Sequence, residues 1–341
     1  MQKLEIQSSA PLRIEAGGLT DVPELLQIDN FEGHVLNAAI NPHALVTITS
    51  RPDTKIVIHS GDFNISETFE SLEQVDSQSN LALIKAAILY EKPRAGFNLS
   101  VETGIYPGSG LGASAAVAVA TLSALKAFKD QKTTKQPSLE TLAKEAIILE
   151  RDYLRNTGGT QDQFAATFGG INFFTYSSIS MQRELLNIPQ ETKQRLIDQA
   201  ILVYSGGSRV SGRILDAIIE EFNKGNPLII EGLIKISETA TALKQSLISG
   251  DLDLFGSQLS LISKTQSSLN KEIMTQEIAE IIKIARSLGA LGVKIMGAGS
   301  GGCILVLCQP NKKKLMTTQL QEKFKLIDFS FSENGVQTYI K

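Results

Sequence analysis

The glycine-rich stretch Pro107-Gly-Ser-Gly-Leu-Gly-Ala-Ser-Ala-Ala116 decides the fold of this chain. Alternating apolar and polar residues precede it and predict a strand at 97–103, whereas an apolar, Ala-rich run follows it and predicts a helix at 112–129. The unpaired N–H groups and the positive dipole end at the start of a helix favour an anion, most often a phosphate. We therefore expect the stretch to bind a phosphate-bearing ligand; a tight packing turn between strand and helix is the alternative.

Length and composition indicate a globular protein of two domains. The chain has 341 residues, which is more than one compact core usually holds, and 42% of them are hydrophobic. A net charge of −3 argues against a nucleic-acid or anionic-membrane partner, and no apolar run approaches the about 20 residues that span a bilayer. We expect a cytoplasmic protein with domains at 1–185 and 186–341. The sequence does not define its oligomeric state.

Apolar periodicity predicts an α+β fold. Strand-like alternation is concentrated in the first 60 residues, and amphipathic helices dominate after about residue 205. Strands are expected at 35–40, 44–49, 97–103, 293–296, 303–308 and 327–340, with another that ends at 204. Helices are expected at 81–90, 112–129, 139–154, 209–223, 227–249, 251–268, 272–288 and 311–325, and a turn-rich segment at 156–163.

Two common nucleotide-binding folds are excluded by what surrounds the glycines. Gly297-x-Gly299-x-x-Gly302 matches the dinucleotide fingerprint, but a strand follows it where that fingerprint requires a helix. The first glycine stretch lacks the second strand with an acidic end that a dinucleotide unit needs, and no Gly-Lys-Ser/Thr of a Walker A loop occurs. The phosphate cradle therefore belongs to another class of fold.

Several polar side chains near these segments are candidates for chemistry. Ser114 stands at the predicted helix start, where its hydroxyl either binds Mg²⁺ beside a phosphate or caps the helix. Glu150, by itself, is typical of a solvated charge at a helix end. Asp162 lies in a turn before an apolar wall and suits either a general base or a capping carboxylate. Asp21 suits hydrogen bonds from polyol hydroxyls, and Arg13 suits charge balance; an ordinary ion pair is the alternative for both.

Taken together, the motifs resemble those of the GHMP kinases, which include galactokinase, homoserine kinase and mevalonate kinase. The family has three motifs. Pro11-x-Arg13 with Gly17-Gly-Leu-Thr-Asp21 resembles the first, Gly110-Leu-Gly-Ala-Ser-Ala-Ala116 the second, and Lys294-Ile-Met-Gly-Ala-Gly-Ser-Gly-Gly302 the third. All three occur in the family's order. The resemblance implies an N-terminal α+β nucleotide domain and a C-terminal ferredoxin-like domain, with ATP and Mg²⁺ as cofactors.

The resemblance also implies roles for individual residues. Asp162 falls on the base that takes the substrate hydroxyl proton, and Arg13 on the arginine beside it. Ser114 and Glu150 fall on magnesium ligands. ATP would be bound by Pro107, Gly108, Ser109, Gly110, Leu111, Gly112, Ala113 and Ser114. The substrate would be bound by Asp21, Thr20, Gly18, Gly159, Gln161, Arg209 and Gly299.

Within the family, the D-glycero-D-manno-heptose 7-phosphate kinase subfamily is the most similar, through the segments 158–173 and 33–40. Galactokinases have Glu-His before the Thr-Asp pair, where this chain has Gly18-Leu19. The resemblance thus implies transfer from ATP to the anomeric hydroxyl of a heptose 7-phosphate. Arg209 and Arg213 are four residues apart where a strand passes into a helix, and they either bind the phosphate of the sugar or are two solvated arginines. The alternatives are a fucose-, galactose- or mevalonate-type kinase, a catalytically silent sugar sensor and a diphosphate decarboxylase.

Three departures from the family pattern accompany the resemblance. Pro107 lies one residue closer to the Gly-Leu-Gly core than is usual. Ala113 stands where the family has the first of two serines. Ala16 and Leu19 stand where the heptose kinases have more glycine.

Overall fold

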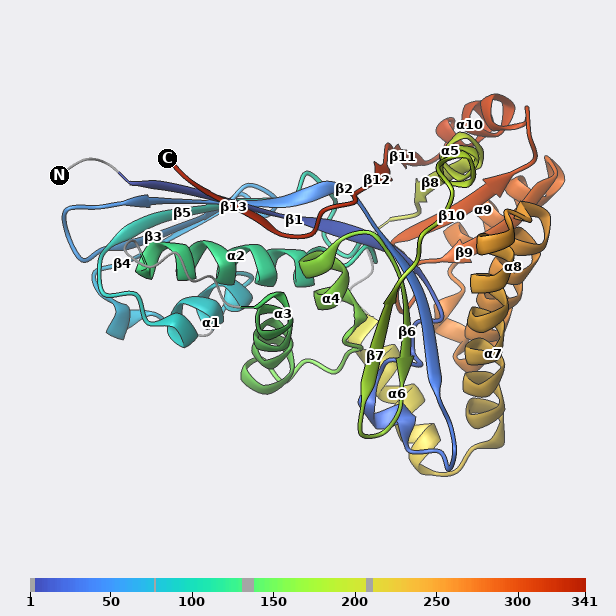
Figure 1. The fold of residues 1–341 in the computed structure, drawn as a ribbon, viewed down its shortest axis with the longest axis horizontal. Coiled ribbons are helices and arrows are strands. Elements are labelled where there is room, and N and C mark those ends of the chain that lie inside the picture. Colours follow the sequence, from blue (N-terminus) through green and yellow to red (C-terminus); the bar gives the residue numbers. More distant parts are fainter. Residues whose placement is uncertain (1–3, 77, 131–137, 207–210) are drawn as a thin grey trace.

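The first sheet is built on two long antiparallel strands, β1 (Glu5–Ala16) and β2 (Gly33–Ser50), in a computed structural model that describes residues 4–76, 78–130, 138–206 and 211–341. The first part of β2 pairs with β6 (Ile171–Tyr176) and the last part with β5 (Phe97–Glu102). The sheet also contains β3 (Ile56–Ser60), β4 (Ile65–Phe69), β7 (Met181–Leu185), β12 (Ser330–Phe331) and β13 (Gln337–Ile340). Because β2 serves both halves of the sheet, it joins the two arms of the molecule in Figure 1.

A shift in the β1–β2 register prepares β1 for the functional site. The shift lies between Pro11 and Leu12, where proline has no N–H to give to the ladder. Such bulges bend a strand and re-aim the side chains that follow. The last residues of β1, which include Arg13 and Glu15, follow this bend and approach both glycine loops.

Helices cover one face of the first sheet. They are α1 (Ala82–Glu91), α2 (Ala113–Lys129), α3 (Leu139–Ile148) and α4 (Gln161–Phe168). The buried face of α2 is rich in alanine, at 115, 116, 118, 120 and 124, so its backbone can lie close to the strands. Figure 1 shows α2 running beneath β1 and β2. This packing holds the N-terminus of α2 beside the end of β1.

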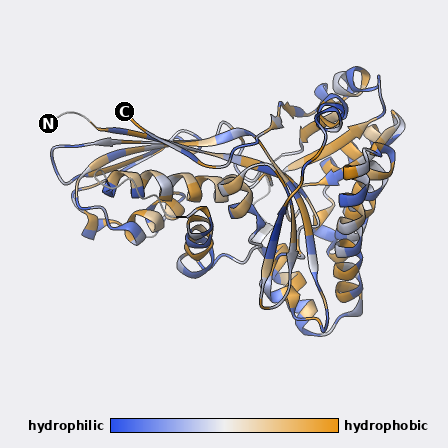
Figure 2. Cartoon of the chain, in the orientation of Figure 1, coloured by the Kyte–Doolittle hydropathy of each residue, from blue (hydrophilic) through white to orange (hydrophobic). Residues whose placement is uncertain are grey.

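The second sheet is smaller and antiparallel, in the order β11 (Lys325–Ile327), β8 (Ala200–Tyr204), β10 (Cys303–Cys308), β9 (Ala290–Ile295). Numbered along the chain this order is 4-1-3-2, that of a ferredoxin-like sheet. Its strands are mainly apolar, as Figure 2 shows. Its helices are α5 (Gln190–Gln199), α6 (Ser211–Asn223), α7 (Pro227–Ser249), α8 (Leu252–Leu269), α9 (Gln276–Ser287) and α10 (Lys313–Gln321).

The end of the chain returns to the first sheet. The sequence predicts one strand at 327–340, but the structure has three short strands there, β11, β12 and β13, because β11 belongs to the second sheet and the other two to the first. β13 pairs with β1, and the Lys341 N–H donates to the Glu5 carbonyl at 2.8 Å. The first and last strands of the chain, β1 and β13, therefore lie side by side (Figure 1).

Other local predictions also differ from the structure. The predicted strands 35–40 and 44–49 are one continuous strand, β2. The predicted helix 139–154 is α-helical only to Ile148 and continues as a π-helical turn, Leu149–Tyr153. The predicted turn 156–163 ends early, because α4 begins at Gln161. Within the part of the chain that the structure describes, no helix is both long and apolar enough to cross a bilayer.

Candidate functional site

Arg13 and Asp162 form the centre of the site. The Arg13 guanidinium donates from Nε to Asp162 Oδ1 and from Nη2 to Oδ2, each at 2.7 Å, although 149 residues separate them. Its Nη1 also donates to the Gly110 carbonyl, and its backbone N–H donates to the Leu111 carbonyl at 2.9 Å. Arg13 therefore connects the carboxylate of Asp162 to the first glycine loop. The two-point pairing holds that carboxylate in one orientation.

Asp162 lies on a helix, not on the turn that the sequence predicts. It is in the first turn of α4, where the positive end of the helix dipole favours a carboxylate. About a quarter of its side chain is exposed, whereas the Arg13 side chain is almost fully buried. The carboxylate of Asp162 can thus contact a ligand while the buried guanidinium of Arg13 fixes its orientation.

The first glycine loop ends at the N-terminus of α2. Gly108, Gly110 and Gly112 have φ values of 76°, 72° and 72°, which favour glycine. The first amides of α2 have no intrahelical acceptor and are available to an anion. The Ser109 hydroxyl is buried and has no hydrogen-bond partner within the described residues. A cradle with unused donors of this kind fits the phosphate chain of a nucleotide.

The third motif packs directly against this loop. The Cys303 N–H donates to the Ser109 carbonyl at 2.8 Å. A Cβ on Gly302 would lie 2.9 Å from the same carbonyl oxygen, and a Cβ on Gly110 would lie 2.8 Å from the Met296 carbonyl oxygen. Two glycine loops that are far apart in the sequence therefore form one wall.

Ser114 and Glu150 face each other next to the cradle. The Ser114 hydroxyl donates to Glu150 Oε1 at 2.5 Å, so it points to this carboxylate instead of capping α2. Glu150 lies on the π-helical turn, and Gln163 Nε2 donates to its other oxygen. Burial raises the pKa of Glu150 above its ordinary value, against the opposing effect of the Ser114 hydrogen bond. One carboxylate and one hydroxyl, completed by phosphate oxygens and water, form a ligand set that suits Mg²⁺.

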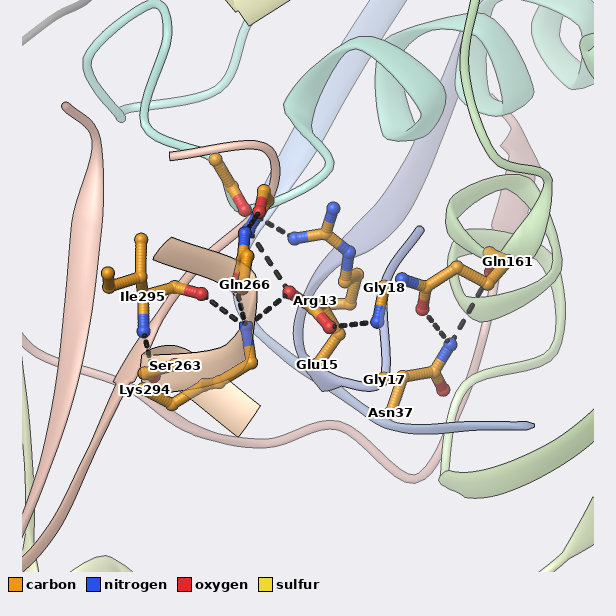
Figure 3. Close-up of polar contacts among 12 residues, drawn as sticks. Arg13, Glu15, Gly17, Gly18, Asn37, Gln161, Ser263, Gln266, Lys294 and Ile295 are labelled. Carbon is orange, nitrogen blue, oxygen red and sulfur yellow. Dashed lines mark hydrogen bonds and ion pairs between the residues drawn. The ribbon is translucent and has the colours of Figure 1, made fainter. Parts of the chain in front are cut away.

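Asp21 is a buried carboxylate close to Asp162. It accepts the Gln161 N–H at 3.1 Å, and a Cβ on Gly159 would lie only 1.9 Å from its Oδ2. Burial, and next the charge of Asp162, raise the pKa of Asp21 to about 6, against the opposing Gln161 hydrogen bond. The side chain of Gln161 is held in turn by Asn37, whose Nδ2 donates to its Oε1 at 2.8 Å (Figure 3).

These groups line one cavity of about 610 Å³. Of the predicted site residues it contains Arg13, Gly18, Asp21, Gly108, Ser109, Gly110, Gly112, Ala113, Ser114, Glu150, Gly159, Gln161 and Asp162. The lining does not include Pro107, Leu111, Thr20 or Gly299. Thr20 is buried and its hydroxyl donates to the Gly17 and His34 carbonyls, while the Leu111 side chain is in the core. Arg209 lies outside the described residues.

Three charged residues that line this cavity were not predicted from the sequence: Glu15, Arg155 and Asp216. Glu15 lines it and pairs with buried Lys294 of the third motif at 3.0 Å (Figure 3). Arg155 also lines it and has no ion-pair partner among the described residues. The position of Glu15 within the first motif, two residues after Arg13, was the available signal for it. Nothing in the local sequence distinguishes Arg155 from a surface arginine.

The fold is that of a family of kinases for small molecules. Residues 80–170 match the GHMP kinases N-terminal domain and residues 241–326 match the GHMP kinases C-terminal domain. The chain is 30% identical to the D-glycero-alpha-D-manno-heptose 7-phosphate kinase of Campylobacter jejuni, and the match covers 98% of each chain. The chain therefore belongs to the GHMP kinase family.

Solved structures agree with this fold. A D-glycero-D-manno-heptose 1-phosphate kinase from Bacteroides thetaiotaomicron superposes with a TM-score of 0.78 at 24% identity, covering 98% of each chain. The galactokinase of Lactococcus lactis superposes with a TM-score of 0.75 at 20% identity, covering 98% of this chain and 95% of that one. Membership of the family makes the chain a phosphotransferase that uses ATP and has an alcohol group as acceptor.

Proposed function

We propose that the chain transfers the terminal phosphoryl group of ATP to the anomeric hydroxyl of D-glycero-D-manno-heptose 7-phosphate. The observation that carries the choice of sugar is the similarity to the C. jejuni heptose 7-phosphate kinase over almost the whole of both chains. The segment 158–173, which holds Gly159, Gln161 and Asp162, resembles the same subfamily.

In the proposed reaction, Asp162 accepts the proton of the attacking hydroxyl. A new bond forms between the sugar oxygen and the γ-phosphorus, the bond to the β–γ bridging oxygen breaks, and ADP leaves. Arg13 orients Asp162 and adds positive charge near the transferred group. The protein forms no covalent bond, so positioning and electrostatics supply most of the rate enhancement.

The residues beside the cradle would hold the magnesium ion. Ser114 and Glu150 are the proposed ligands, and Mg²⁺ bound there would neutralise charge on the nucleotide phosphates. The charge of the cavity supports this proposal. Asp21, Glu150, Asp162 and Asp216 line it, whereas Arg13 is already paired with Asp162. A polyphosphate would be repelled by these carboxylates unless a divalent cation accompanied it.

Arg155 is the proposed contact for the phosphate at the far end of the sugar. Among the described residues of the lining, it is a cation with no carboxylate of its own. Arg155→Ala is expected to raise KM for the sugar phosphate by about 10-fold or more, since a hydrogen-bonded charge contact is worth about 1.5–3 kcal/mol. KM for the same sugar without its phosphate should not change. An equal rise in KM for both substrates would show that Arg155 does not bind the phosphate of the sugar.

The experiment that tests the proposed function is an assay of ATP consumption with a panel of acceptors. The panel contains heptose 7-phosphate, fucose, galactose and mevalonate, and NMR of the product locates the new phosphate. We expect the highest kcat/KM for heptose 7-phosphate and a phosphate on the anomeric oxygen. Preference for another acceptor, or phosphorylation at another position, would contradict the proposal. No consumption with any acceptor would favour the sensor, and release of CO₂ would favour the decarboxylase.

A further inference from the structure

Glu15 joins the first and third motifs through three hydrogen bonds. Its Oε2 accepts the Gly18 N–H at 2.9 Å, and its Oε1 accepts both the Gly297 N–H at 3.1 Å and Lys294 Nζ at 3.0 Å. The side chains of Glu15 and Lys294 are each only 1% exposed, so water cannot replace these contacts. Figure 3 shows the carboxylate between the turn that contains Gly18 and the strand that carries Lys294.

A second side chain completes the arrangement from α8. Gln266 Nε2 donates to the Gly297 carbonyl at 2.7 Å, and its Oε1 accepts Lys294 Nζ at 3.2 Å. The N–H of Gly297 is thus held by Glu15 and its carbonyl by Gln266. Gly297 has a φ of 62° and packs on Gly110, whose Cα would lie 3.2 Å from a Cβ at position 297. A shift of Gly297 toward Gly110 would therefore displace the first glycine loop.

β1 carries both connections to the glycine loops. Arg13 and Glu15 are two residues apart on a strand and so lie on the same face. Arg13 binds the Gly110 carbonyl of the first loop, while Glu15 binds Gly297 at the start of the third motif. The wall of the phosphate cavity is thus attached to one strand at two adjacent positions.

A buried ion pair is a poor source of stability, because both charges must be removed from water. Burial alone would raise the pKa of Glu15, but the charges of Lys294 and Arg13 lower it below its ordinary value. Glu15 is therefore a charged carboxylate, which is the acceptor that the two backbone N–H groups and the ammonium of Lys294 require. The charge of Glu15 in turn contributes to the raised pKa of the neighbouring Asp21. The Glu15–Lys294 pair therefore serves to fix the positions of the backbone groups that it binds, and not mainly to stabilise the fold.

We propose that Glu15 is a positioning residue, with Lys294 as its counter-ion, and that together they hold the third motif against the first glycine loop in the arrangement that binds the nucleotide phosphates. This clasp, defined as Glu15, Lys294, Gly18 and Gly297, requires the kinase activity of the family but not any particular sugar. Its test therefore uses ATP binding measured without an acceptor, which does not depend on the proposed heptose substrate.

The test compares Lys294→Met with a matched control, Lys85→Met. Lys85 is also 1% exposed and is paired with Glu67 at 3.0 Å and Asp76 at 2.7 Å, but it does not line the cavity. We expect both variants to lower Tm. Lys294→Met should also weaken ATP binding by about 10- to 100-fold by calorimetry, the scale of a misplaced binding group, and should raise KM for ATP more than it lowers kcat. Lys85→Met should leave ATP binding unchanged. Equal ATP affinity in the two variants would overturn the proposal.

The exchanged pair Glu15→Lys with Lys294→Glu separates the clasp from a simple ion pair. The exchange restores opposite charges but places an ammonium against the N–H groups of Gly18 and Gly297. We expect ATP affinity to stay low, and Glu15→Asp, which keeps the acceptor on a shorter side chain, to retain part of it. Recovery of wild-type affinity in the exchanged pair would overturn the clasp. If the exchanged pair does not fold, the comparison of Lys294→Met with Lys85→Met decides.

Discussion

Gly159→Ala should disturb acceptor binding through Asp21. An alanine Cβ at this position would lie 1.9 Å from Asp21 Oδ2 and 2.3 Å from its Cγ, about 1.5 Å short of ordinary van der Waals contact at 3.4 Å. Asp21 is only 3% exposed and accepts the Gln161 N–H, so it cannot move away without losing that bond. Overpacking of this kind costs about 1–3 kcal/mol.

The adjacent Gly158 supplies the control. A Cβ there would meet nothing within 4 Å, and neither glycine has a positive φ, so both substitutions suit the backbone equally. We expect Gly158→Ala to leave the free energy of unfolding unchanged or raise it by about 0.4–1 kcal/mol, because alanine restricts the unfolded chain.

Denaturant unfolding and steady-state kinetics test the pair. Gly159→Ala should lose about 1–3 kcal/mol of unfolding free energy and raise KM for the acceptor by about 10-fold, since each 1.4 kcal/mol is a factor of ten. KM for ATP should not change, because the three atoms nearest to an added Cβ all belong to Asp21. Indistinguishable stability and acceptor KM in the two variants would refute the close contact between Gly159 and Asp21 and the role of Asp21 at the acceptor.

Three further predictions concern the carboxylates of the cavity. Asp162→Asn should lower kcat by about 10²–10⁴-fold, the usual contribution of a general base, and unchanged kcat with the identified acceptor would exclude that role. Glu150→Gln should raise the Mg²⁺ concentration needed for half-maximal rate, and Ser114→Ala should do so to a smaller degree; an unaltered Mg²⁺ titration in both would place the metal elsewhere. The pKa of Asp21 is raised from 3.8 to about 6, so the folded state binds the proton more tightly than the unfolded state does. The free energy of unfolding of the wild-type protein should therefore fall by about 2 kcal/mol as pH rises from 4 to 7 on account of this group. Asp21→Asn should remove that part of the pH dependence in unfolding measured across the range, and identical profiles for the two proteins would contradict the raised pKa.

The parts of the fold that follow from local pattern could be predicted from the sequence. The predicted strand at 97–103 and helix at 112–129 agree with β5 and α2 to within one residue at each end, because alternation and glycine placement are properties of neighbouring residues. α4 was missed, since it is short and follows two glycines. The π-helical turn at Leu149–Tyr153 was missed as well, because one extra residue in a helical turn leaves the apolar spacing almost unchanged.

The residues of the candidate site could also be predicted only in part from the sequence. The glycine loops and the family motifs named Arg13, Asp162, Ser114 and Glu150 as candidates before any contact was known. They did not predict that the Ser114 hydroxyl would meet Glu150, since no local rule places residue 114 against residue 150. Arg155 could not be selected, because its distinction is a missing partner in space.

By itself, the sequence determined the α+β class and the kinase family and predicted the phosphate cradle, since each of these depends on motifs and patterns that are local in the chain. Only the tertiary structure decided that Glu15 would meet Lys294 across 279 residues, and only it gave the two-point geometry by which Arg13 holds Asp162. The physical reason is that a buried charge needs an oppositely charged or hydrogen-bonding partner. Tertiary packing supplies that partner, and separation along the sequence does not predict which residue it will be. The tertiary structure thus joined the glycine stretch at 107–116 and the third motif into one cavity wall.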